Sequence, residues 1–143
     1  MQPPNVPGGW RGVLAAAEAL AALIVTQVAL RFCHFRSVRR VLWGMAEVLR
    51  ARRPLESSAL LWAMSAAKRR CPVRSTCLGE ALVAEALLRQ HGYSPTLCMG
   101  AARRGGRFEA HAWLEQDDAV VIGGPAEMVK QYTRFPEIAS LTL

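Results

Sequence analysis

Residues 77–90 read CLGEALVAEALLRQ, and the character of this segment indicates the fold class of the chain. Its charged side chains, two glutamates and one arginine, point in different directions around a helical wheel, so the segment has no continuous polar stripe. A helix that is apolar on most of its sides is usually buried. We therefore predict a central, buried helix that begins at Cys77 and ends at the pair His91-Gly92.

The period of the apolar residues changes after this helix. Residues 96–102 and 108–115 are predicted strands, and a basic, glycine-rich turn at 103–106 connects them. Residues 119–122 form a third predicted strand that ends at Gly123, and a short helical or irregular tail follows. These strands predict a small antiparallel sheet on which the central helix packs.

The chain before Cys77 is predicted to be helical. A flexible lead-in of prolines and glycines, residues 1–10, precedes it. Apolar residues then recur at helical spacing in three segments, the third of which starts with Pro54 in its first turn. We expect a helical N-terminal region at residues 11–72 and a core of α+β class at residues 73–143.

Length and charge limit the classes of protein. The chain has 143 residues, of which 52% are hydrophobic, so it can form one core, and a disordered tail or a string of modules is excluded. Residues 1–74 carry 12 basic and 3 acidic side chains, whereas residues 75–143 carry 6 and 8. Basic clusters of this kind are usually solvated helix ends that complement the helix dipole, and they could also bind an acidic partner or anionic lipid. We predict no nucleic-acid partner, because the helices contain no motif that reads bases.

The cysteines and the N-terminus indicate a compartment. Four cysteines are too few and too unevenly spaced for a disulfide framework, and the chain begins without the basic segment of a secretory signal, so a cytoplasmic protein is expected. Residues 13–30 are apolar, but Glu18 interrupts them, which favours a helix packed in the core or against a partner over a membrane span. Peripheral membrane contact through residues 12–40 stays open.

Cys77 and His111 are the candidate catalytic pair. Cys77 begins the predicted buried helix, where free backbone amides and the helix dipole favour a thiolate. His111 lies in the middle of a predicted strand, on the same face as Trp113. If the helix packs on that face, the thiol and the imidazole meet and can perform acyl transfer as nucleophile and base. The alternative for each residue is a structural role in the core.

Neither a metal nor a cofactor is predicted. Cys71, Cys77 and His91 lack the paired short spacings of a zinc site.

Several segments together resemble a known family. They are CLGEALVAEALLRQHGYSPTLCMG from Cys77, AHAWLE around His111 and VVIGG before Pro125, followed by Tyr132 near the end. The sequence is similar to the protease half of the lasso-peptide B-protein, a transglutaminase-like cysteine peptidase, and the likeness extends to FRSVRRVL at 35–42. The resemblance implies a transglutaminase/papain-like core, with Cys77 as the nucleophile and His111 as the general base.

The resemblance also implies a function and partners. Such proteins remove the leader from a ribosomally made precursor peptide, and an ATP-dependent cyclase then closes the lasso. A small partner domain recognises the leader. Because the helical region shows no strand-rich module, we expect a separate leader-recognition protein. The alternative is a catalytically weak scaffold of the same fold that delivers the precursor to the cyclase.

One position departs from the family pattern. The resemblance places the acid of a Cys-His-Asp triad at Gly123, which has no side chain. Glu115 lies about 13 Å along the strand from His111, too far to orient its ring. Glu80 would disfavour a thiolate if it were ionised. The alternatives are a backbone carbonyl, a distant side chain, or a dyad without a third group.

Overall fold

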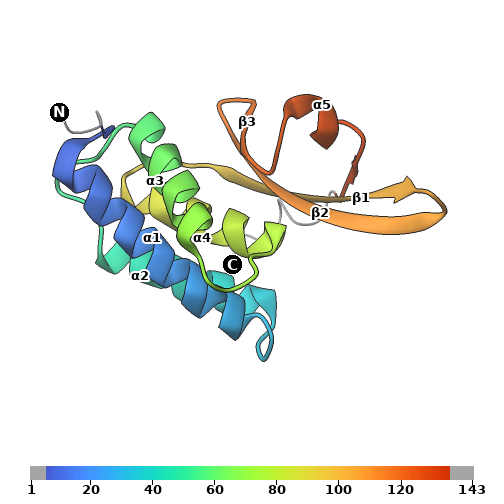
Figure 1. Cartoon of the computed structure of the whole chain (residues 1–143), viewed down its shortest axis with the longest axis horizontal. Helices are drawn as coiled ribbons and strands as arrows, with labels where there is room; N and C mark the ends of the chain where they lie inside the picture. The colour runs from blue at the N-terminus through green and yellow to red at the C-terminus, as the bar shows by residue number, and fades with distance from the viewer. Residues whose placement is uncertain (1–5, 136–143) are drawn as a thin grey trace.

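A computed structural model describes residues 6–135 and contains a helical layer and a four-stranded antiparallel sheet (Figure 1). The helices are α1 (Gly9–Ala29), α2 (Phe35–Val48), α3 (Ser57–Arg70), α4 (Cys77–Gln90) and α5 (Ala126–Val129). The strands are β1 (Thr96–Arg104), β2 (Arg107–Gln116), β3 (Ala119–Ile122) and β4 (Thr133–Arg134). Helices α1–α4 lie on one side of the sheet and α5 lies on the other (Figure 1). The predicted α+β class, with helices first and a small antiparallel sheet after them, is confirmed.

Helix α4 is the buried centre of the helical layer, as predicted. Leu82, Ala84 and Leu88 are almost completely buried, and the helix contacts α1, α2 and α3 as well as the sheet. Its buried carboxylate, Glu85, pairs with Arg39 of α2 at an Nη2–Oε1 distance of 2.7 Å. A charge in the interior requires a partner of opposite sign, and this pair meets that requirement.

Small side chains let α1 pack closely against its neighbours. Ala15 and Ala19 of α1 and Ala63 of α3 are buried in one core. Gly79 of α4 leaves room for α1, because a Cβ there would lie 2.6 Å from Cδ of Gln27. Helix α1 begins at Gly9, inside the lead-in predicted for residues 1–10, of which residues 1–5 lie outside the described part of the chain.

The start of α3 corrects the expectation for Pro54. The helix begins at Ser57, and the backbone before it bonds to residues that follow α4. The N–H of Leu55 donates to Nδ1 of His91 (3.0 Å), and the carbonyl of Leu55 accepts from the hydroxyl of Tyr93 (3.0 Å). These two bonds commit the backbone of Leu55 to partners outside α3, which displaces the helix start toward Ser57.

The sheet has the order β3-β2-β1-β4, and each neighbouring pair is antiparallel. The hairpin of β1 and β2 is longer than predicted, since pairing extends to Arg104 and Arg107 and leaves Gly105-Gly106 as the turn. Both glycines have a positive φ, which a two-residue hairpin turn requires.

One hydrophobic core joins the helices to the sheet. It combines buried residues of α1, α3 and α4 with Leu97 of β1 and with Ala112 and Leu114 of β2. The helical region predicted at 11–72 therefore shares its core with the region predicted at 73–143, of which residues 136–143 lie outside the described part.

The His91 contact gives a pH-dependent prediction. Burial lowers the pKa of His91, the charge of Glu18 opposes this and that of Arg11 adds to it, and the net pKa lies below the ordinary value of 6.5. The unfolded chain therefore takes up a proton at a higher pH than the folded one. The His91 contribution is complete above about pH 6.5 and is lost as the pH falls below that value toward the folded pKa.

We expect the melting temperature to fall between about pH 7.5 and about pH 5.5. The fall should be smaller in His91→Gln, whose amide oxygen accepts from Leu55 N without titrating. Calorimetry at the two pH values measures both. Equal pH dependence in the two proteins would contradict the assignment to His91.

Candidate active site

Cys77 begins α4, as predicted. Thr76 caps the helix: its Oγ1 accepts from the N–H of Gly79 (3.2 Å) and donates to Oε1 of Gln27 (3.1 Å), which ties this helix end to α1. Cys77 is half-buried, and its backbone N–H donates no hydrogen bond to any residue in the described range 6–135. A thiol and a free amide thus lie together at the positive end of the helix dipole, which favours an anion.

The carboxylate of Glu80, one turn beyond Cys77, is engaged by groups that precede α4. The hydroxyl of Ser75 donates to Oε1 (2.6 Å), and Nζ of Lys68 lies 3.1 Å from Oε2. The Lys68 ammonium offsets the negative charge, so Glu80 opposes a thiolate less than a lone carboxylate would.

His111 lies in β2, and its ring contacts the backbone just after β3. Nε2 of His111 is 2.6 Å from the carbonyl oxygen of Gly123. A carbonyl oxygen only accepts, so Nε2 donates this hydrogen bond, and in the neutral ring Nδ1 is then the nitrogen with the free lone pair. Of the alternatives that the sequence left open for orienting the ring, the structure places a backbone carbonyl there. It belongs to the residue at which the resemblance expected an acid.

Two aromatic rings surround this imidazole. The ring centroid of Tyr132 lies 5.0 Å from that of His111, and the centroid of Trp113 lies 6.2 Å from it. Trp113 is 2% exposed and belongs to a small second cluster with Cys98 and Val129, so it is a core residue. The contact with Tyr132 was not predicted, because it depends on how the chain after β3 folds back over the sheet.

The structure does not bring Cys77 and His111 together. Regular pairing along β2 alternates its side chains between two faces. Ala112 and Leu114 face the core to which α4 and Cys77 belong, whereas His111 and Trp113 face α5 and Tyr132. For the thiol and the imidazole to meet, α4 would have to pack on the opposite face of β2, the one that carries His111. Within residues 6–135 no hydrogen bond links the thiol to the imidazole.

Glu115 shares the face of His111 but points to other partners. Its carboxylate accepts from Nε1 of Trp113 (2.9 Å) and from the guanidinium of Arg134. Burial raises the pKa of Glu115, but these two hydrogen bonds outweigh it and leave the pKa below its ordinary value. The carboxylate of Glu115 therefore binds groups other than the His111 imidazole, as expected from its separation from His111 along the strand.

The missing side chain at position 123 has a steric reason. Gly123 has φ +112°, and a Cβ there would lie 2.9 Å from Cα of Trp113 and 3.2 Å from the carbonyl oxygen of Ala112. Neither neighbour is the flexible end of a side chain. An aspartate at this position would therefore be strained and would displace the strand that carries His111.

We expect Gly123→Ala to lower the free energy of unfolding by about 2–4 kcal/mol, since it combines backbone strain with overpacking. Gly92→Ala is the matched control, because Gly92 also has a positive φ, of +89°, but no atom within 4 Å of its added Cβ. It should cost about 1 kcal/mol. Urea denaturation compares the two variants, and equal losses would contradict the steric argument.

The other cysteines differ from Cys77 in environment. Cys98 is buried, and burial together with the charge of Glu115 raises its thiol pKa. Cys33 is exposed, and Cys71 is half-buried like Cys77. In the part of the chain that is described, no group of three or more His, Cys, Asp or Glu side chains is placed to hold a metal ion.

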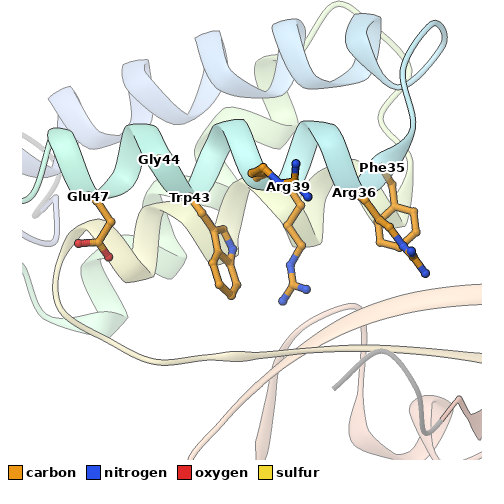
Figure 2. Close-up of a pocket in the computed structure, with 7 residues that line it drawn as sticks. Phe35, Arg36, Arg39, Trp43, Gly44 and Glu47 are labelled. Atoms are coloured by element: carbon orange, nitrogen blue, oxygen red, sulfur yellow. The ribbon is translucent and has the colours of Figure 1, made fainter. Parts of the chain in front are cut away.

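A pocket of about 400 Å³ lies on α2 (Figure 2), and neither Cys77 nor His111 lines it. Two guanidinium groups lie against the ring of Trp43, with Arg39 at 4.5 Å and Arg89 at 3.8 Å from its centroid. Arg39 is also the partner of Glu85. The residues that line the pocket are Phe35, Arg36, Arg39, Arg40, Trp43, Gly44 and Glu47.

Comparison with known families assigns the chain to a class. The family model described as the transglutaminase-like superfamily matches residues 20–137, which is most of the chain. The protein therefore belongs to the transglutaminase-like superfamily, a family that includes cysteine peptidases. No curated protein and no solved structure matches the chain.

Proposed function

We propose that the protein is a cysteine peptidase that removes the leader from a ribosomally made lasso-peptide precursor, with Cys77 as nucleophile and His111 as general base. The observation that carries the proposal is the Nε2 contact of His111 with Gly123, which leaves Nδ1 as a free base in a transglutaminase-like chain. The position of the Cys77 thiol beside a free backbone amide at the start of α4 supports it further.

In the proposed reaction, Nδ1 of His111 takes the thiol proton and Sγ of Cys77 attacks the carbonyl carbon of the last leader residue. The oxyanion accepts a hydrogen bond from the Cys77 amide. The carbon–nitrogen bond breaks, the proton passes to the leaving amine, and the leader stays bound as a thioester. Water, deprotonated by His111, then releases the leader as a carboxylate and restores the thiol.

The proposal requires a conformation in which Sγ of Cys77 meets Nδ1 of His111, and this differs from the described one, in which β2 lies between them. Catalytic contacts often form only in the complex with substrate. We propose that the precursor and a separate leader-recognition protein produce this conformation, and that an ATP-dependent cyclase takes up the freed amine.

A scaffold that delivers the precursor to the cyclase is the second candidate. The observation that favours it is the separation of the two residues on opposite faces of β2. A scaffold needs neither a reactive thiol nor a base.

Reconstitution with the precursor and the recognition protein tests the peptidase. We expect mass spectrometry to detect the free leader and the core peptide. An intact precursor after extended incubation would contradict the proposal.

Iodoacetamide labelling of the protein in that complex separates the two candidates. Peptide mapping should find Cys77 alkylated faster than the exposed Cys33 near pH 6, because only a thiol held as thiolate reacts there. The buried Cys98, whose thiol pKa is raised, should react slowest. Equal rates at Cys77 and Cys33 would favour the scaffold.

A further inference from the structure

Most of the exposed large apolar side chains lie on α1, α2 and the turn between them. Among the described residues, ten of twelve such side chains fall within positions 10–49. They are Trp10, Val13, Leu14, Val25, Val28, Phe32, Val41, Met45, Val48 and Leu49, which we call the apolar face. A contiguous apolar surface of this kind on a water-soluble domain marks an interaction site.

The outward side of α1 carries almost no polar group. Every exposed residue of this helix is apolar or glycine except Glu18, whose carboxylate accepts from the amide of Gln90 (3.0 Å). Trp10, 73% exposed, lies at one end of the helix, and Phe32, 84% exposed, lies just beyond the other. Aromatic side chains at the ends of an apolar stripe are typical of helices that lie in a lipid–water interface.

The apolar face continues from α1 onto α2 across a groove. The groove has a volume of about 280 Å³, and its floor is α4. Val25 of α1, Met45 of α2 and Leu49, which caps α2, form its walls. In Figure 1, α1 and α2 lie alongside each other at the edge of the molecule away from the sheet.

Arginines surround this face at both ends. Arg31 is exposed at the turn that joins α1 to α2, and Arg50 and Arg52 are exposed after the end of α2. Glu47 lies 3.7 Å from Arg50 and offsets part of the charge at that end. The periphery of the face is thus positive, which complements an anionic surface.

We propose that the apolar face binds an anionic lipid bilayer, with α1 lying in the plane of the interface. A single partner helix in the groove would cover Val25 and Met45 but would leave Val13 and Val48, on the outer sides of the two helices, in water. A flat bilayer covers all of them at once.

An interfacial position also keeps the fold intact. Helix α1 is the one helix in residues 6–135 that is long and apolar enough to span a membrane. However, its Ala15, Ala19 and Leu23 are buried in the core, and a spanning helix would lose those contacts. Lying in the interface uses only the side that the core leaves exposed. This binding is independent of the peptidase proposal.

Co-sedimentation of the whole 143-residue chain with vesicles tests the inference. We expect binding to vesicles that contain phosphatidylglycerol, weaker binding to phosphatidylcholine alone, and weakening with added salt. Val25→Glu should lower the partition coefficient roughly tenfold or more, because it puts a charge at the membrane contact. Arg31→Gln should lower it roughly fivefold. Phe108→Ser is the matched control, since Phe108 is 78% exposed on the β1–β2 hairpin, and it should bind as the wild type does.

Failure to sediment with phosphatidylglycerol vesicles, or unchanged binding of Val25→Glu, would overturn the inference. Sedimentation equilibrium without lipid identifies the other occupant. If the protein does not bind vesicles but forms a dimer that Val25→Glu dissociates, the apolar face binds a second copy of the chain.

Discussion

Precursor cleavage is expected to fall by roughly a thousandfold or more when Cys77 is replaced by alanine, because no other group supplies the nucleophile of the thioester path. His111→Ala should cause a loss of similar size, since the thiol then has no proton acceptor. The double variant should be little worse than either single one, because the two residues act as one unit. Single-turnover assays with the precursor and recognition protein measure all three rates.

Two features of this experiment distinguish chemistry from folding. Cys71→Ala removes a thiol that is half-buried like that of Cys77, six residues earlier, and it should cleave at nearly the wild-type rate. Precursor affinity should persist in Cys77→Ala, because the side chain is small and the substitution leaves the Thr76 cap in place. Cleavage by Cys77→Ala at the wild-type rate would end the assignment of the nucleophile.

Replacing Arg39 by alanine is expected to lower the free energy of unfolding by about 3–5 kcal/mol, because it leaves a buried carboxylate without its partner. The side chain of Glu85 is 1% exposed, and Arg39 donates to it twice, from Nε to Oε2 at 3.0 Å and from Nη2 to Oε1 at 2.7 Å. Two parallel bonds from one guanidinium are the strong form of this interaction. Denaturant titration followed by circular dichroism measures the loss.

Two comparisons test the cause of that loss. Arg40→Ala changes an exposed arginine one residue along the same helix and should stay within about 0.5 kcal/mol of the wild type. Arg39→Met combined with Glu85→Leu replaces the pair by apolar groups and should be more stable than Arg39→Ala. A loss below about 1 kcal/mol for Arg39→Ala would contradict the buried pair.

The helical half and the central helix were predictable from sequence because their signals are local. Apolar spacing identifies a helix and its direction of burial, and the absence of a polar stripe marked α4 as the centre. The start of α3 was not predictable, since it depends on His91 and Tyr93, which lie 36 and 38 residues after Leu55. Hydrogen bonds between residues so far apart cannot be recognised from a short window of sequence.

The sequence supplied the candidate residues of the site but not their arrangement. Residue type and position identified Cys77 and His111, and the alternation of β2 separated His111 and Trp113 from Ala112 and Leu114. Both sets contain apolar side chains, so alternation alone does not say which set meets a helix. The structure decided it, because Ala112 and Leu114 complete the core beneath α4 while Val129 and Tyr132 cover Trp113 from the other side. Local periodicity determines the helices and strands of this protein and the two faces of each. Which face packs against which helix depends on the whole core, because each face is buried by segments that are distant in sequence.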